Sequence, residues 1–130
     1  MKIILILAAL FSISFSLSST ATVYELRTYT PNEGKMENLL TRFRDHTLGI
    51  FESHGITNIG YWLTEKKEGE TQKLVYLIAH KDKDAAEASW KAFKADPKWK
   101  AVFAASHVNG VLVKEVVSQY LTPTDFSKIK

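Results

Sequence analysis

The order of its hydrophobic periodicities is the feature that most restricts how this chain can fold. Alternating patterns rich in β-branched and aromatic residues predict strands at residues 23–29, 57–64, 73–80 and 111–121. Apolar residues spaced three and four apart predict helices after the first strand and after the third. This β-α-β-β-α-β order is typical of the ferredoxin-like α+β fold, in which both helices cover one face of a four-stranded antiparallel sheet.

Local signals predict where the first helix begins and ends. Residues 30–33, Thr-Pro-Asn-Glu, match a capping box with proline at the first helical position. Gly55 matches a left-handed cap at the other end. We expect Arg42 on the polar face of this helix, together with Arg44, Asp45 and Glu52. The expected apolar face contains Met36, Leu39, Leu40, Phe43, Thr47, Ile50, Phe51 and His54.

The second helical region is predicted to consist of two segments. Asp82 or Asp84 caps the first segment, whose Ala86, Trp90 and Phe93 share one face. Proline is excluded from a helix interior but suits a first turn, so Asp96 is expected to cap a second segment over residues 98–107. Asn109-Gly110 then ends the helix, and the last strand follows.

Both faces of the predicted sheet are apolar, although the helices can cover only one. The uncovered face would be a large exposed apolar patch, which a second subunit could cover. This predicts a homodimer; the alternative is that the last strand and the tail after Pro123 fold over that face. The third strand places Leu74, Tyr76 and Ile78 opposite Val75, Leu77 and Ala79, and the fourth places Val111, Val113 and Val117 opposite Leu112, Val116 and Tyr120.

The N-terminal segment has the pattern of a secretory signal peptide. Lys2 precedes an apolar stretch over residues 3–17, and the small residues Ser19 and Ala21 predict cleavage before Thr22. An uncleaved membrane anchor is the alternative, but the stretch is shorter than the ~20 residues that a spanning helix needs. We therefore expect export to the periplasm or the medium, with no membrane span after cleavage.

The mature chain is expected to be one domain. The division is a signal peptide over residues 1–21 and a domain over residues 22–130. Cysteine is absent, which excludes disulfides and thiolate chemistry. Acidic and basic residues are interspersed, which argues against a nucleic-acid partner.

Motifs on every predicted element resemble those of the NIPSNAP family, a branch of the dimeric α/β barrel superfamily. The resemblance implies the ferredoxin-like fold and the dimer, but the family has no generally accepted catalytic set. The wider superfamily includes cofactor-free monooxygenases, haem-handling enzymes and isomerases. Mitochondrial members differ in their N-terminal extension and often carry a second copy of the domain, so their roles are not transferred. The matching motifs are VYELRTYTP, LLTRFRDHT, IFESHG, GYW, KLVYLIAH, SWKAFKADPKW and YLTPTDFS.

Polar residues on the first predicted helix and the first predicted strand are the first candidates for chemistry. His46 is spaced to face the sheet, where it could act as a general base or ligand anchor, or as a structural histidine bonded to a carbonyl. Glu25, Arg27 and Tyr29 alternate on one face of the first strand. If buried, Glu25 and Arg27 must form a pair, which would be a structural ion pair or part of a binding site.

Four aromatic residues could line a site for a flat ligand, or could belong to the core. They are Trp62, Tyr76, Trp90 and Trp99. The histidine spacing does not fit a metal site, and the motifs for dinucleotides, phosphates and serine hydrolysis are absent, so we expect neither metal nor cofactor.

Three functions remain open at the level of sequence. The first is an exported homodimer that binds a small apolar or aromatic molecule. The second is a cofactor-independent monooxygenase-like enzyme with His46 as base and Tyr76 and Arg27 as orienting groups. The third is a protein-interaction module. A cavity between the first helix and the sheet would favour the first two, and the absence of a cavity would favour the third.

Overall fold

The computed structural model describes residues 21–130, so most of the predicted signal peptide lies outside the described residues. The order of elements confirms the β-α-β-β-α-β prediction, with each helical region divided into segments. The elements are β1 (Val23–Pro31), α1 (Met36–Arg42), the π-helical segment η1 (Phe43–Thr47), α2 (Leu48–Ser53), β2 (Thr57–Leu63), β3 (Leu74–His80), α3 (Lys83–Ala95), α4 (Pro97–Ser106) and β4 (Val113–Leu121).

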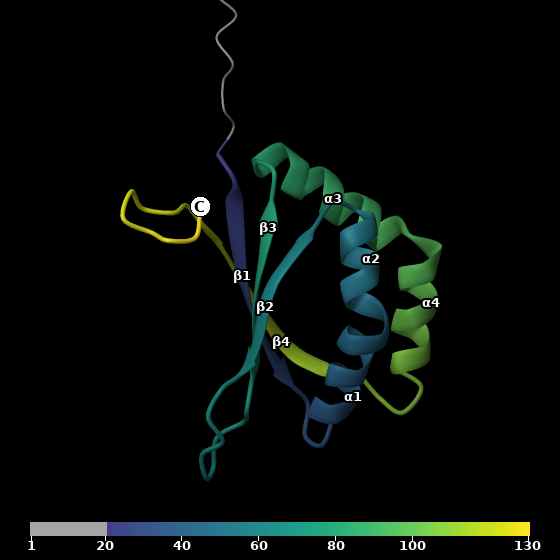
Figure 1. Cartoon of the computed structure of the whole chain (residues 1–130). Helices are drawn as coiled ribbons and strands as arrows, with labels where there is room; N and C mark the ends of the chain where they lie inside the picture. The colour runs from purple at the N-terminus through teal and green to yellow at the C-terminus, as the bar shows by residue number, and fades with distance from the viewer. Residues whose placement is uncertain (1–20) are drawn as a thin grey trace, which may run out of the picture.

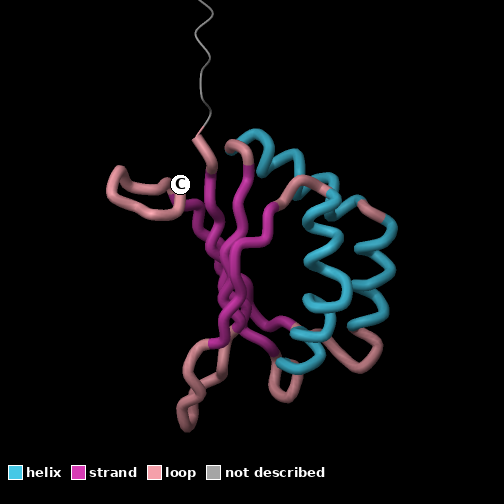
Figure 2. Tube along the Cα trace, viewed as in Figure 1, coloured by secondary structure: helices cyan, strands magenta, loops and turns pink. Residues whose placement is uncertain are grey.

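The molecule has two layers, a sheet and a layer of helices. The four strands are antiparallel in the order β2-β3-β1-β4, so β1 and β3 are central. Figure 1 shows all helices on the same side of this sheet, as predicted. The tube in Figure 2 shows the other side of the strands without any helix. Within residues 21–130, no helix has the length and apolar character needed to cross a membrane.

The predicted capping box at residues 30–33 is wrong. Pro31 pairs with Val113 at the end of β1, and the Asn32 amide donates to the Leu112 carbonyl at 2.9 Å. These bonds to β4 hold the segment in the sheet, where a helical first turn cannot form. Helix α1 therefore begins only at Met36, without a side-chain cap.

The first helical region contains a π-helical turn that the apolar spacing did not predict. In η1 the Leu48 amide donates to the Phe43 carbonyl, five residues back. The Thr47 hydroxyl also donates to the Arg42 carbonyl, at 3.1 Å. A π-helical turn holds more residues than an α-helical turn, so side chains near it are rotated relative to a regular α-helix.

The other helix ends follow the predictions. The Asp82 carboxylate accepts from the Ala85 amide at 2.7 Å, which identifies it as the cap of α3 in place of Asp84. The Asp96 carboxylate accepts from the Lys98 amide at 2.7 Å, and α4 begins with Pro97, one residue before the predicted start. Gly55 follows α2 with φ of 75°, the left-handed conformation expected of a glycine cap.

Aromatic rings fill the space between the sheet and the helices. Tyr76 on β3 is fully buried, and its ring stacks on Tyr61 of β2 with centroids 5.0 Å apart. Phe43 and Phe51 from the first helical region pack on Tyr76 at 5.2 and 6.3 Å between centroids. The interior between these helices and the sheet is therefore a packed core.

The side chains of β4 point to the two faces of the sheet in a different grouping from the one predicted. Thr30 pairs with Glu115 but Pro31 pairs with Val113, so Lys114 is an extra residue in a β-bulge. Cross-strand partners share a face, and this bulge places Val113 on the helix side with Val116 and Tyr120, while Val117 faces away. The predicted grouping of Val113 with Val117 is therefore wrong.

The face of the sheet that lies opposite the helices, here called the open sheet face, is apolar and uncovered. Side chains on this face include Trp62, Val117 and Leu121, which are 55%, 46% and 40% exposed. In Figure 1 the C-terminal segment turns away from β4 at one end of the sheet. Its Phe126 is 84% exposed, so in this chain the tail does not cover the face as the alternative required.

Candidate functional site

Glu25 is the centre of a buried polar cluster on the helix side of the sheet. Its side chain is 1% exposed, and both carboxylate oxygens are fully used. Oε1 accepts from Arg27 Nη1 at 2.7 Å and from the Ser118 hydroxyl at 2.6 Å. Oε2 accepts from His80 Nε2 at 2.9 Å and from Trp90 Nε1 at 2.7 Å. The predicted pairing of Glu25 with Arg27 is confirmed, and we call these residues the Glu25 cluster.

The four donors keep the Glu25 carboxylate ionised. Burial raises the pKa of Glu25, but the hydrogen bonds from His80, Ser118, Arg27 and Trp90 lower it more, to about 2. The donors come from β1, β3, β4 and α3, so the carboxylate connects three strands and one helix. This favours the interpretation of a structural ion pair.

The guanidinium nitrogens of Arg27 also have acceptors among the neighbouring side chains. Its Nε donates to the Tyr76 hydroxyl at 2.9 Å, and its Nη2 donates to the Tyr29 hydroxyl at 3.3 Å. The guanidinium lies over the Trp90 ring, with Cζ 4.4 Å from a ring centroid. A hollow of about 500 Å³ lies above this cluster between α3 and β4. The donors beneath it already have acceptors, and its remaining charged side chains are the exposed Glu87, Lys91 and Lys94 of α3.

The four candidate aromatic residues do not form one wall. Tyr76 is fully buried in the core, and Trp90 and Trp99 pack against the same core. Trp62 lies on the open sheet face, where its ring covers Gly60. A Cβ added at Gly60 would lie 2.4 Å from the Trp62 ring, so only glycine allows the ring to lie in this position. Tyr76, Trp90 and Trp99 therefore belong to the core, and only Trp62 lies outside it.

His46 does not face the sheet, which corrects its predicted orientation. It is exposed, and Thr47, one residue later, takes the buried position at 1% exposure. The π-helical turn explains the difference, because it rotates His46 away from the line through Leu39 and Phe43. His46, Tyr76 and Arg27 are thus not assembled around one volume, as the monooxygenase-like hypothesis required.

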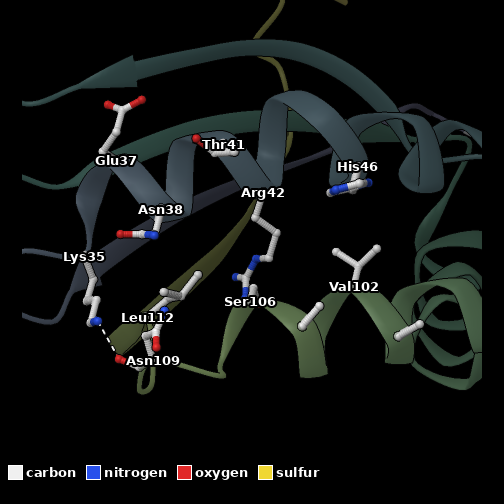
Figure 3. Close-up of a pocket in the computed structure, with 12 residues that line it drawn as sticks. Lys35, Glu37, Asn38, Thr41, Arg42, His46, Val102, Ser106, Asn109 and Leu112 are labelled. Carbon is white, nitrogen blue, oxygen red and sulfur yellow. Dashed lines mark hydrogen bonds between the residues drawn. The ribbon is translucent and has the colours of Figure 1, made fainter.

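A pocket lies between α1 and α4, on the outer side of the first helix. It has a volume of about 550 Å³, within the range of small-molecule sites. We call it the α1–α4 pocket; Figure 3 shows Arg42 and His46 on its upper side and Ser106 and Val102 on its lower side. Its apolar surface comes from Ala101, Val102, Ala105 and Leu112.

Arg42 is the unusual residue of this pocket. It is 5% exposed, contrary to its predicted place on the polar face, because α4 packs against that side of α1. Its Nη1 donates to the Ser106 hydroxyl at 3.2 Å, and its Nε has no partner. Its Cζ lies 5.2 Å from the Trp99 ring centroid and 5.7 Å from that of Phe103. Among residues 21–130, no carboxylate lies within 4.0 Å of this guanidinium.

The sequence patterns did not point to Arg42, because they assumed a regular α-helix with one apolar side. One signal was available: Trp99 and Phe103 are four residues apart and form an aromatic ridge on α4. Such a ridge can hold an arginine through cation–π contacts. No cluster of three or more potential metal-ligating side chains occurs in the described part of the chain.

Comparison with protein families gives a match to the NIPSNAP model over residues 24–128. No curated protein matches the sequence. A NIPSNAP family protein of unknown function from Agrobacterium tumefaciens is similar in structure, with 23% identity and a TM-score of 0.71. The alignment covers 85% of this chain and 95% of that one.

Two further solved structures are similar in fold. An uncharacterised NIPSNAP domain protein from Burkholderia xenovorans is 27% identical, with a TM-score of 0.66 over 81% of this chain and 97% of its own. A putative antibiotic biosynthesis monooxygenase from Caulobacter crescentus is 20% identical, with a TM-score of 0.54 over 82% and 93%. At this identity, the likeness to the monooxygenase concerns the fold alone.

Proposed function

The chain belongs to the NIPSNAP family, and on this premise we propose that it is an exported homodimer that binds a small, largely apolar molecule in the α1–α4 pocket. The pocket itself is the observation that carries the proposal. It combines about 550 Å³ of volume with an apolar wall and a few polar groups, the usual composition of a ligand site.

The arrangement favours binding over the two other functions. The cavity expected between the first helix and the sheet is filled by the core, and the cavity that favours binding over a protein-interaction module lies instead between α1 and α4. A monooxygenase-like enzyme needs its base and orienting groups around one substrate, whereas Tyr76 is buried in the core and His46 lies at the α1–α4 pocket. Binding requires neither a catalytic base nor a cofactor.

Native mass spectrometry of the exported protein tests the ligand. We expect the protein purified from its own compartment to carry a small molecule. Ala105→Trp should remove this molecule because the indole fills the pocket, and Ala104→Trp, also exposed on α4 but outside the pocket, should retain it. If the wild-type protein carries no molecule, or if Ala105→Trp retains it, this pocket is not the site.

The open sheet face supports the homodimer. By the strand register, the charged side chains of this face lie at one end of β4, where Lys114 and Glu115 line a hollow with Thr30. A second copy would present the same largely apolar surface, so pairing two such faces through the rest of the sheet buries apolar area without burying unpaired charges. The uncovered Trp62 and Val117 would lie within that interface.

Light scattering tests the assembly. The wild-type domain should have twice the mass of one chain, and Trp62→Glu should give monomers because it would bury a charge in the interface. Val108→Glu is the matched control, since Val108 is 79% exposed in the turn after α4, away from the sheet. A wild-type monomer at micromolar concentration would contradict the homodimer.

Export is tested by the position of the mature N-terminus. The small residues before Thr22 support cleavage at that point. N-terminal sequencing of the protein from the periplasm or the medium should therefore begin at Thr22. Protein that retains Met1 and stays in the cytoplasm would contradict export.

A further inference from the structure

We propose that the α1–α4 pocket selects an organic monocarboxylate, whose carboxylate binds Arg42 and whose apolar part lies against α4. This inference rests on the proposed function and adds the chemical class of the ligand. Its basis is a buried cation that the protein does not neutralise within the described residues.

The surroundings of Arg42 are those of a site prepared for an anion. A buried guanidinium ordinarily has a carboxylate partner, since an unpaired buried charge is unfavourable. In the described residues Arg42 has one acceptor, the Ser106 hydroxyl, and an unpartnered Nε. Burial accordingly lowers the pKa of Arg42. Nε is enclosed by the protein, so a carboxylate in the pocket would bind through the Nη atoms and give the guanidinium the charged acceptor that it lacks.

Arg27 provides an internal comparison. It is also largely buried, but it has Glu25 and two tyrosine hydroxyls as acceptors. Both guanidiniums contact aromatic rings, so cation–π contact does not distinguish them. The difference is the missing charged acceptor at Arg42, which is the arginine that lines the α1–α4 pocket.

The direction of the Arg42 side chain brings it into the pocket. Figure 3 shows it extending from α1 toward Ser106 on α4, while Glu37 points away from it. Glu37 instead lies 4.0 Å from Arg44, an exposed residue about two turns farther along the same helical region. The pocket's acidic residue therefore does not neutralise Arg42.

The shape of the site favours a carboxylate with an apolar group attached. A guanidinium matches a carboxylate through two parallel hydrogen bonds. Beyond the guanidinium, Ala101, Val102 and Ala105 supply an apolar wall along α4. The pocket lining also includes Lys35 and Glu37, whose charges are opposite, so Arg42 leaves one positive charge to balance, which favours a monoanion over a dianion.

Calorimetry with two probes of the same chain length, octanoate and 1-octanol, tests the inference. Wild type should bind octanoate about tenfold or more tightly than 1-octanol, the range expected for a hydrogen-bonded charge. Arg42→Met should remove this preference and bring the ratio of the two affinities close to one. Arg44→Met is the matched control and should keep the wild-type preference, because Arg44 is exposed outside the pocket.

Arg42→Lys is the second variant, to be used if Arg42→Met does not fold. It keeps the charge but loses the planar fork, so octanoate should bind more weakly than to wild type while 1-octanol binding is unchanged. Equal affinity of wild type for the two probes, or a preference for octanoate that survives Arg42→Met, would overturn the inference but leave the pocket as a ligand site. If neither probe binds and the exported protein carries no molecule, the proposed function itself fails.

Discussion

Replacing Glu25 with glutamine should strongly destabilise the domain. The substitution keeps the size of the side chain but removes the charge that balances Arg27. It also places an amide donor among the four groups that donate to Glu25. A glutamine side chain cannot accept all four bonds, so buried donors lose their partner.

The pKa of Glu25 gives the size of the effect. Its pKa is about 2 in the folded protein, against an ordinary value of 4.5. This difference corresponds to about 3 kcal/mol of stability at neutral pH, at about 1.4 kcal/mol for each pH unit. Because the folded pKa is the lower one, the stabilisation is present above pH 4.5 and is lost as the pH falls toward 2. Leaving Arg27 unpaired adds to this, so we expect a loss of about 3 to 5 kcal/mol in Glu25→Gln.

Urea denaturation followed by circular dichroism, at fixed protein concentration and at several pH values, measures both effects. Wild type should lose stability below pH 4.5, and Glu25→Gln should lack this part of the pH dependence. Glu37→Gln is the control, because Glu37 is 77% exposed, and it should change the free energy of unfolding by less than about 0.5 kcal/mol. A loss of less than about 1 kcal/mol at pH 7 in Glu25→Gln would refute the reasoning.

Three further substitutions test single features by the same denaturation assay. Arg42→Met should raise the free energy of unfolding of the ligand-free protein by about 1 kcal/mol, because it removes a buried charge that has no carboxylate partner; a clear loss would show that the cation stabilises the fold. Gly55→Ala should lower it by about 1 kcal/mol, since alanine is strained at a φ of 75°, and no change would mean that the turn adapts. Asp82→Ala should lower it by about 1 kcal/mol through loss of the helix cap, whereas Asp84→Ala, which lacks this role, should have a smaller effect; equal losses would contradict the cap assignment.

The sequence determined the features that depend on neighbours along the chain. The order of strands and helices followed from spacing alone, since alternation and three-to-four-residue periods predict different elements. The caps at Asp96 and Gly55 followed from the conformations that these residues favour locally. The pairing of Glu25 with Arg27 followed from their positions on one face of a strand, because a buried charge requires a partner.

The tertiary structure decided the features that depend on segments far apart in the sequence. The bonds from residues 31 and 32 to β4 replaced the predicted capping box, and the bulge at Lys114 set the faces of that strand. The π-helical turn exposed His46, and the packing of α4 on α1 buried Arg42. The spacing of apolar residues shows only that a helix has a buried side. It does not show which second helix will cover the polar side, and in this protein the contact between α4 and the polar side of α1 forms the pocket.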